Sequence, residues 1–154
     1  MGKPDTAGVV APPPLIYLAA VVVGLALRRL APAPVLPRPL AYELGVAVIV
    51  IAVALALWGV REMRRAGTSE STAVPTRALV TTGPFRLSRN PLYVSLTLCY
   101  LGIMLAAQAL WGLALVVVVL FVMRRGVIDR EERYMSRRFG DAYLRYRKQV
   151  RRWM

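Results

Sequence analysis

Basic residues are absent from four long apolar runs in this sequence, residues 15–27, 40–60, 92–107 and 109–123. Each run is near the length of about 20 residues that an α-helix needs to cross a bilayer, and flanking arginines can extend the shorter ones by reaching the headgroups. The sequence therefore predicts an all-α, polytopic membrane protein that forms a single domain over residues 1–154. The predicted transmembrane helices are residues 15–30, 40–60, 91–107 and 109–123, followed by a cytosolic helical tail at residues 124–154.

The distribution of basic residues predicts how the chain crosses the membrane. With four spans, the leader, residues 61–90 and the tail lie on one side and hold 18 of the 21 lysines and arginines, whereas the first linker on the other side holds three. Lysine and arginine accumulate in cytoplasmic loops. We therefore expect both termini to be cytoplasmic in a bacterial or archaeal inner membrane.

Composition limits the chemistry that this chain can support. It has no histidine and one cysteine, Cys99, which makes an intrachain disulfide impossible and predicts that no metal is bound. A formal net charge of +13 suits anionic membrane lipids as partners, each nearby basic residue contributing roughly 1 kcal/mol. Nucleic acid is not expected as a partner, because no recognised binding motif accompanies the charge.

The polar segment at residues 81–93, TTGPFRLSRNPLY, separates the two apolar halves. Its Gly-Pro pair predicts a turn, and two arginines lie beside that turn. Asn90 and Pro91 then predict the start of a helix, where backbone N–H groups and the positive end of the helix dipole can hold a carboxylate or a ribose. The alternative is a plain loop between membrane helices whose arginines reach the headgroups.

A second charged segment, DREERYMSRRF, follows the fourth apolar run. Its adjacent glutamates, Glu131 and Glu132, project about 100° apart on a helix, so at most one fully faces a given pocket. This spacing places Glu132 near Ile128 and toward the apolar bundle, and Glu131 nearer Arg124 and Arg138. The alternative is that both belong to a solvated helix face.

The tail continues with a predicted break and a further helix. Gly140 is expected to end the helix that extends from the fourth span, and Asp141 to start another. In that last helix an apolar stripe at helical spacing faces away from a basic surface. The stripe is Tyr143, Tyr146, Val150 and Trp153, and the basic surface is Arg145, Arg147, Lys148, Arg151 and Arg152.

Taken together, GPFRLSRNPLY, an apolar hairpin and REERYMSRRFGDAYLRYRKQVRRW resemble the C-terminal half of the isoprenylcysteine carboxyl methyltransferase family. That family has the signature Arg-His-Pro-x-Tyr, a hydrophobic span and then Glu-Glu, and the related phospholipid methyltransferases share much of it. The resemblance implies an integral-membrane enzyme that uses S-adenosylmethionine in a cytosol-facing pocket. It also implies a lipidic or small hydrophobic acceptor, either an isoprenylcysteine-type carboxylate or a phospholipid amine.

The resemblance also implies which residues form the site. Arg89 and Glu132 take catalytic positions, and the implied cofactor-binding residues are Pro84, Phe85, Asn90, Pro91, Leu92, Tyr93, Glu131 and Glu132. Asn90 stands where the signature has histidine, which keeps hydrogen-bonding capacity but removes titration near neutral pH. The sulfonium methyl is already activated, so positioning dominates. An amine or thiol acceptor must also lose a proton, for which Glu132 or Tyr93 is the expected helper.

The competing hypothesis is a small four-helix transporter or binding protein with a basic membrane-anchoring tail. Glu43, near the start of the second apolar run, would then be the coupling carboxylate. The tail distinguishes the two hypotheses, because a minimal transporter has no need for a tail of some thirty residues, rich in basic and aromatic side chains, after its last span.

Overall fold

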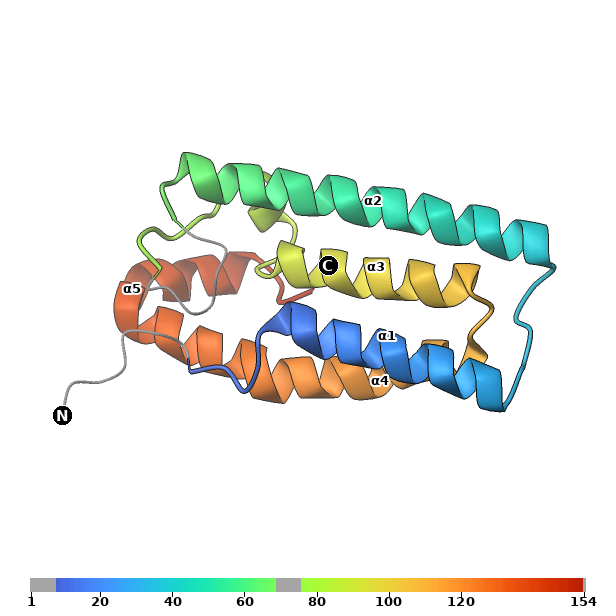
Figure 1. Ribbon diagram of the computed structural model, residues 1–154. Helices are drawn as coiled ribbons and strands as arrows, with labels where there is room; N and C mark the ends of the chain where they lie inside the picture. Colours follow the sequence, from blue (N-terminus) through green and yellow to red (C-terminus); the bar gives the residue numbers. More distant parts are fainter. Residues whose placement is uncertain (1–7, 69–75, 154) are drawn as a thin grey trace.

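The computed structural model describes residues 8–68 and 76–153, and these residues form helices and connecting segments without a strand (Figure 1). The elements are α1 (Pro13–Leu30), α2 (Arg38–Arg65), the short 3₁₀ helix η1 (Gly83–Arg86), α3 (Pro91–Ala106), α4 (Leu110–Met123), the π-helical turn η2 (Arg124–Ile128) and α5 (Asp129–Gln149). The predicted all-α class is confirmed. Lys3, one of the basic residues counted for orientation, lies outside the described residues.

The helices have the length and surface of a polytopic membrane protein. The helices α1, α2 and the helical stretch from Leu110 to Gln149 are long and apolar enough to cross a membrane, and α3 is a shorter apolar helix of 16 residues. Large apolar side chains point outward along α1, α2 and α4, among them Val22, Ile51, Leu57, Val117 and Phe121. An exposed apolar surface of this extent is what lipid contact requires.

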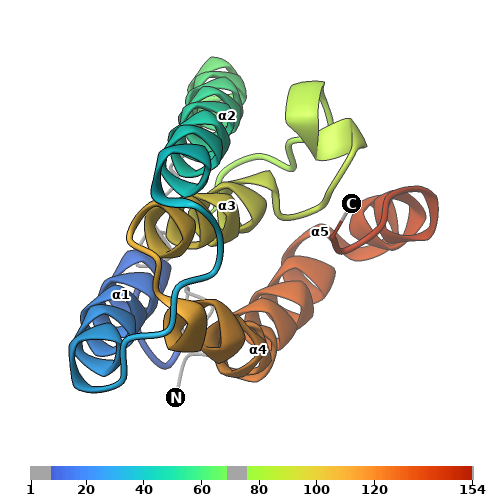
Figure 2. The same ribbon diagram turned by 90° about the vertical axis from the view of Figure 1, so that its right-hand side faces the viewer.

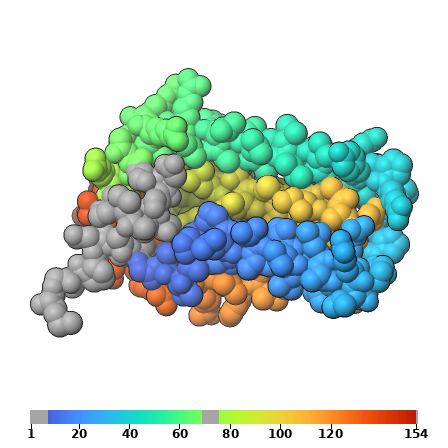
Figure 3. Space-filling view, viewed as in Figure 1, coloured from blue at the N-terminus to red at the C-terminus, as the bar shows by residue number. Residues whose placement is uncertain are grey.

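Helix α3 is the centre of the bundle, since it contacts α1, α2 and α4 (Figure 2). The space-filling view in Figure 3 shows it as a band between α2 and α1. Its approach to α2 depends on Gly45 and Gly102. A Cβ atom on Gly102 would lie 2.8 Å from the Gly45 carbonyl oxygen, so only glycine permits this spacing.

Gly140 divides α5 into two parts. Its backbone has φ 51° and ψ −129°, which breaks the helix. This confirms the prediction that the helix extending from the fourth span ends here. The chain then reverses, and the part of α5 after Gly140 lies beside the part before it (Figure 1).

The basic segments gather at one end of the bundle. The first described residues, the end of α2, η1, the start of α3 and all of α5 lie there, opposite the linker 31–37 and the turn 107–109 (Figure 1). At that opposite end the Gln108 side chain holds the linker: Oε1 accepts from the Val35 and Leu36 N–H groups at 2.8 and 3.3 Å, and Nε2 donates to the Leu36 carbonyl at 2.7 Å. This arrangement matches an even number of spans.

Candidate functional site

The loop before α3 is fastened to the C-terminal segment, which we define as residues 150–153. The Arg89 N–H donates to the Arg151 carbonyl at 2.9 Å, and the Ser88 hydroxyl donates to the Arg152 carbonyl at 3.1 Å. Asn90 precedes α3 as predicted, but its side chain does not cap the helix. Its Nδ2 donates to the Arg152 carbonyl at 3.1 Å. The loop that carries Arg89 and Asn90 is therefore joined directly to the C-terminal segment.

Glu132 lies at the centre of a cluster of charged side chains. It is 7% exposed. Arg152 binds its carboxylate in a bidentate manner, with Nε 3.0 Å from Oε1 and Nη2 2.7 Å from Oε2. The third nitrogen of Arg152, Nη1, lies 3.0 Å from Asp129 Oδ1. These hydrogen bonds to Glu132 raise the pKa of the Arg152 guanidinium, so it remains charged. Two-pronged pairing of this kind is strong and fixes geometry.

Arg89 approaches the same carboxylate but leaves donors free. Its Nη1 lies 3.1 Å from Glu132 Oε1, yet neither Nη1 nor Nε has a hydrogen-bond acceptor among the described residues. The Arg89 side chain is only 10% exposed. Buried donors without acceptors are costly and rare. Arg89 is therefore ion-paired with Glu132 through Nη1, and its Nε N–H has no acceptor among the described residues.

Glu131 faces the opposite way, toward α3. The Tyr93 hydroxyl donates to its Oε1 at 2.6 Å. Burial, which the Tyr93 hydrogen bond only partly offsets, raises the pKa of the Glu131 carboxyl to about 7. This carboxyl lies beyond the apolar part of α4, which ends at Met123.

The predicted orientation of the two glutamates is confirmed only in part. Glu132 is the more buried of the two, as expected, but its partners are arginines, and Glu131, expected near Arg124 and Arg138, contacts Tyr93 of α3 instead. The prediction assumed a uniform 100° step from Arg124 onward, whereas η2 is a π-helical turn and shifts the register. The reversal at Gly140 also places Arg152 on the Glu132 side, which spacing along the chain cannot show.

A polar chain connects Tyr93 to the first helix. The Thr97 hydroxyl donates to the Tyr93 carbonyl at 2.8 Å, and the Tyr17 hydroxyl lies 2.7 Å from Thr97 Oγ1. Tyr17 is 4% exposed. Buried polar groups that satisfy one another in this way fix one packing arrangement. Sequence reasoning missed Tyr17 and Thr97, because both lie within apolar runs.

The remaining predicted site residues have supporting positions. Pro84 and Pro91 are buried, and the Phe85 carbonyl accepts a hydrogen bond from the Tyr146 hydroxyl at 2.6 Å. Leu92 lies against Gly59 of α2 and so points away from the glutamates. The structure thus brings Arg89 and Asn90 to Glu132 and Tyr93 to Glu131, and it leaves Leu92 apart.

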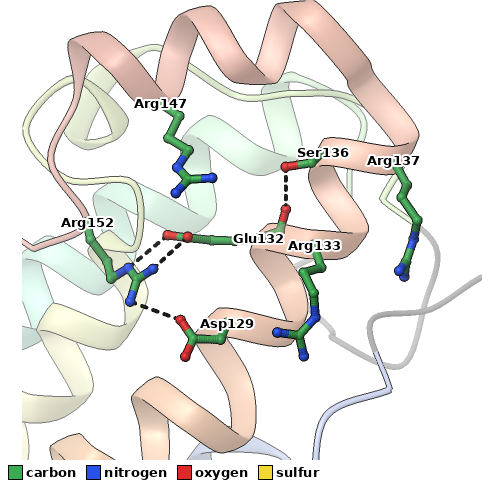
Figure 4. Close-up of a pocket in the computed structure, with 7 residues that line it drawn as sticks. All are labelled: Asp129, Glu132, Arg133, Ser136, Arg137, Arg147 and Arg152. Carbon is green, nitrogen blue, oxygen red and sulfur yellow. Dashed lines mark hydrogen bonds and ion pairs between the residues drawn. The ribbon is translucent and has the colours of Figure 1, made fainter.

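A cleft of about 460 Å³ opens between the two parts of α5 (Figure 4). It is lined by Asp129, Glu132, Arg133, Ser136, Arg137, Arg147 and Arg152. In Figure 4, Arg147 reaches into it from the part of α5 after Gly140, and Arg152 reaches Glu132 from the chain that follows α5. Its volume is in the range of small-molecule sites, about 300–1,000 Å³. Sequence reasoning treated Arg147 and Arg152 only as members of a basic surface.

Comparison with known proteins identifies the family. The model of the phospholipid methyltransferase family matches residues 40–142, about two thirds of the chain. The chain belongs to this family. An uncharacterised protein of Haemophilus influenzae is 40% identical over 68 residues, which are 41% of this chain and the whole of that protein. No solved structure matches. Together with the apolar helices, this family membership makes the protein a membrane methyltransferase.

Proposed function

We propose that the protein transfers a methyl group from S-adenosylmethionine to a lipidic or small hydrophobic acceptor. The cofactor would lie where the loop before α3 meets the two glutamates of α5. One observation carries the proposal: in a methyltransferase of this family, Arg89 and Tyr93 lie within 3.1 and 2.6 Å of adjacent carboxylates, Glu132 and Glu131. Two motifs about 40 residues apart in sequence thus form one polar centre.

The groups present suit the cofactor. Arg89 pairs with Glu132 through Nη1 and has a buried Nε donor without an acceptor among the described residues, which a cofactor carboxylate would satisfy. Glu132 and Asp129 supply acceptors toward the cleft for an ammonium group or ribose hydroxyls. When bound, S-adenosylmethionine supplies a methyl group that its sulfonium already activates.

The chain's own contribution is then mainly positioning and the handling of one proton. Holding two reactants in line accounts for a large part of the rate enhancement of a transfer reaction. A carboxylate acceptor needs no proton removed, whereas a protonated amine does. A carboxyl with a pKa of about 7 is suited to accept that proton at neutral pH, so we assign this role to Glu131, with Tyr93 holding it in place.

The exposure of charged side chains on α2 and α5 supports a membrane enzyme over a transporter. Glu43, the carboxylate that a transporter would use, is exposed on the outer surface of α2 rather than turned toward α3. Basic side chains of the last part of α5, Arg145 and Lys148, are exposed and suit contact with anionic headgroups. We further propose that this end of the bundle is cytoplasmic.

A transfer assay tests the proposal. Purified protein is incubated with methyl-labelled S-adenosylmethionine and a total membrane-lipid extract, and the organic phase is counted before and after alkaline hydrolysis. We expect label in the organic phase; alkali-resistant label indicates an N-methyl product, and alkali-labile label a methyl ester. The control is Arg89→Gln. Absence of label above this control would contradict the proposed reaction.

A further inference from the structure

We propose that Arg152 is a positioning residue of the cofactor site, so that the site is incomplete without the C-terminal segment. This inference deepens the proposed function and rests on it. The family match ends at residue 142, so nothing in it assigns a role to residues 150–153. The backbone hydrogen bonds of this segment, the side-chain contacts of Arg152 and their consequence for Arg89 support the assignment.

The backbone of the C-terminal segment is fixed on the loop before α3. Val150 leaves the helix in an extended conformation, and the next two carbonyls then accept three hydrogen bonds from residues 88–90. Two of these converge on the single carbonyl of Arg152. Ordering a segment outside a helix costs conformational entropy, which these hydrogen bonds offset. The position of Arg152 is therefore set by the same loop that carries Arg89.

The side chain of Arg152 bridges two carboxylates one helical turn apart. Asp129 and Glu132, three residues apart, lie on the same face of α5, and one guanidinium contacts both. The Glu132 side chain is 9% exposed and that of Arg152 22% exposed, so water screens their contact weakly. Arg152 thus ties the loop before α3 to the start of α5.

The consequence for a ligand lies in what Arg152 does to Arg89. Because Arg152 forms hydrogen bonds with both oxygens of Glu132, Arg89 keeps only a 3.1 Å contact without hydrogen-bond geometry. Its Nη1 therefore remains ion-paired with Glu132, and its buried Nε is left without an acceptor and can donate to an anionic group that enters the site. Without Arg152, Arg89 is free to turn onto Glu132 and satisfy its donors there. The site would then lose its receptor for a carboxylate.

The test compares two ligands that differ in that carboxylate. Calorimetry on purified full-length protein is performed with S-adenosylhomocysteine and with 5′-methylthioadenosine, which lacks the amino-acid part. We expect Arg152→Gln to weaken S-adenosylhomocysteine binding by roughly tenfold or more and to leave 5′-methylthioadenosine binding unchanged. Arg152→Lys should restore binding only in part, because an ammonium cannot form the bidentate contact. The matched control is Arg151→Gln, which removes the same charge from the exposed neighbouring residue and should change neither affinity.

Three results would overturn the inference. The first is an equal change in S-adenosylhomocysteine affinity in Arg152→Gln and Arg151→Gln. The second is an equal loss of affinity for both ligands in Arg152→Gln. The third is tighter ligand binding by Arg152→Gln, which would mean that Arg152 competes with the ligand for Glu132. A ligand-free measurement separates this inference from the proposed function. In a double-mutant cycle, the effects of Arg152→Gln and Glu132→Gln on the unfolding equilibrium constant should depart from additivity by roughly fivefold or more. The effects of Arg151→Gln and Glu132→Gln should be additive. If wild-type protein binds neither ligand, the proposed function fails. That coupling then decides whether Arg152 positions Glu132.

Discussion

Glu131 is the residue through which pH should act most directly on this protein. Burial raises the pKa of its carboxyl from the usual 4.5 to about 7, although Tyr93 donates a hydrogen bond to it. Each unit of pKa shift corresponds to about 1.36 kcal/mol, so ionisation of Glu131 costs the folded protein about 3 kcal/mol more than it costs the unfolded chain. Glu131→Gln removes this cost, since the side chain is neutral at every pH and its carbonyl can still accept the Tyr93 hydrogen bond.

The sign of the effect follows from proton binding. Between pH 4.5 and about 7 the folded protein holds a proton on Glu131 that the unfolded chain has lost. The free energy of unfolding therefore falls as pH rises through this interval and levels off above it. We expect Glu131→Gln to abolish this fall. The variant should match wild type near pH 5 and exceed its stability at pH 8 by up to about 3 kcal/mol.

The assay is reversible denaturant unfolding in detergent micelles at several pH values across this interval. Asp141→Asn is the control, because Asp141 is an exposed carboxylate and its removal should leave the pH dependence of wild type intact. Parallel curves of unfolding free energy against pH for wild type and Glu131→Gln would contradict this prediction. They would mean that the Glu131 carboxyl titrates alike in the folded and unfolded states.

Two further predictions concern the cluster and the topology. Glu132→Gln should lower the free energy of unfolding by about 3 kcal/mol, because it leaves two largely buried guanidiniums without their carboxylate; an unchanged denaturation midpoint would contradict this. In a Cys99→Ser background, Pro34→Cys should react with an impermeant thiol reagent added to intact cells, and Arg145→Cys only after permeabilisation. The reverse pattern would show that the orientation is wrong.

The sequence predicts the fold well because the fold depends on local signals. Basic residues or prolines bound the apolar runs except at the uncharged turn around Gln108, so most helix ends are visible without a structure. Gly83 and Gly140 were both expected to interrupt regular structure, and both have positive φ. Gln108 is an exception. Its local sequence shows only one polar residue between two apolar runs, although its amide fastens a linker some 70 residues away in sequence.

The site is less predictable because it depends on relationships between distant segments. The positions that match the family signature are enough to identify Arg89, Tyr93 and the two glutamates as candidate site residues. It does not show which glutamate meets which partner, because a π-helical turn changes the helical phase just before them. Arg152 is indistinguishable in sequence from its basic neighbours, and only the reversal at Gly140 and the hydrogen bonds from residues 88–90 bring it to Glu132.

We propose that the loop before α3 and the charged cluster of α5 together form a binding site for S-adenosylmethionine. This site can be tested by titration calorimetry of purified wild-type protein with S-adenosylmethionine and S-adenosylhomocysteine, between about pH 6 and 8. We expect binding of both at micromolar affinity and at least a roughly tenfold loss in Arg89→Gln, which lacks the buried donors. No binding of either ligand across this pH range, or equal binding by Arg89→Gln, would contradict it.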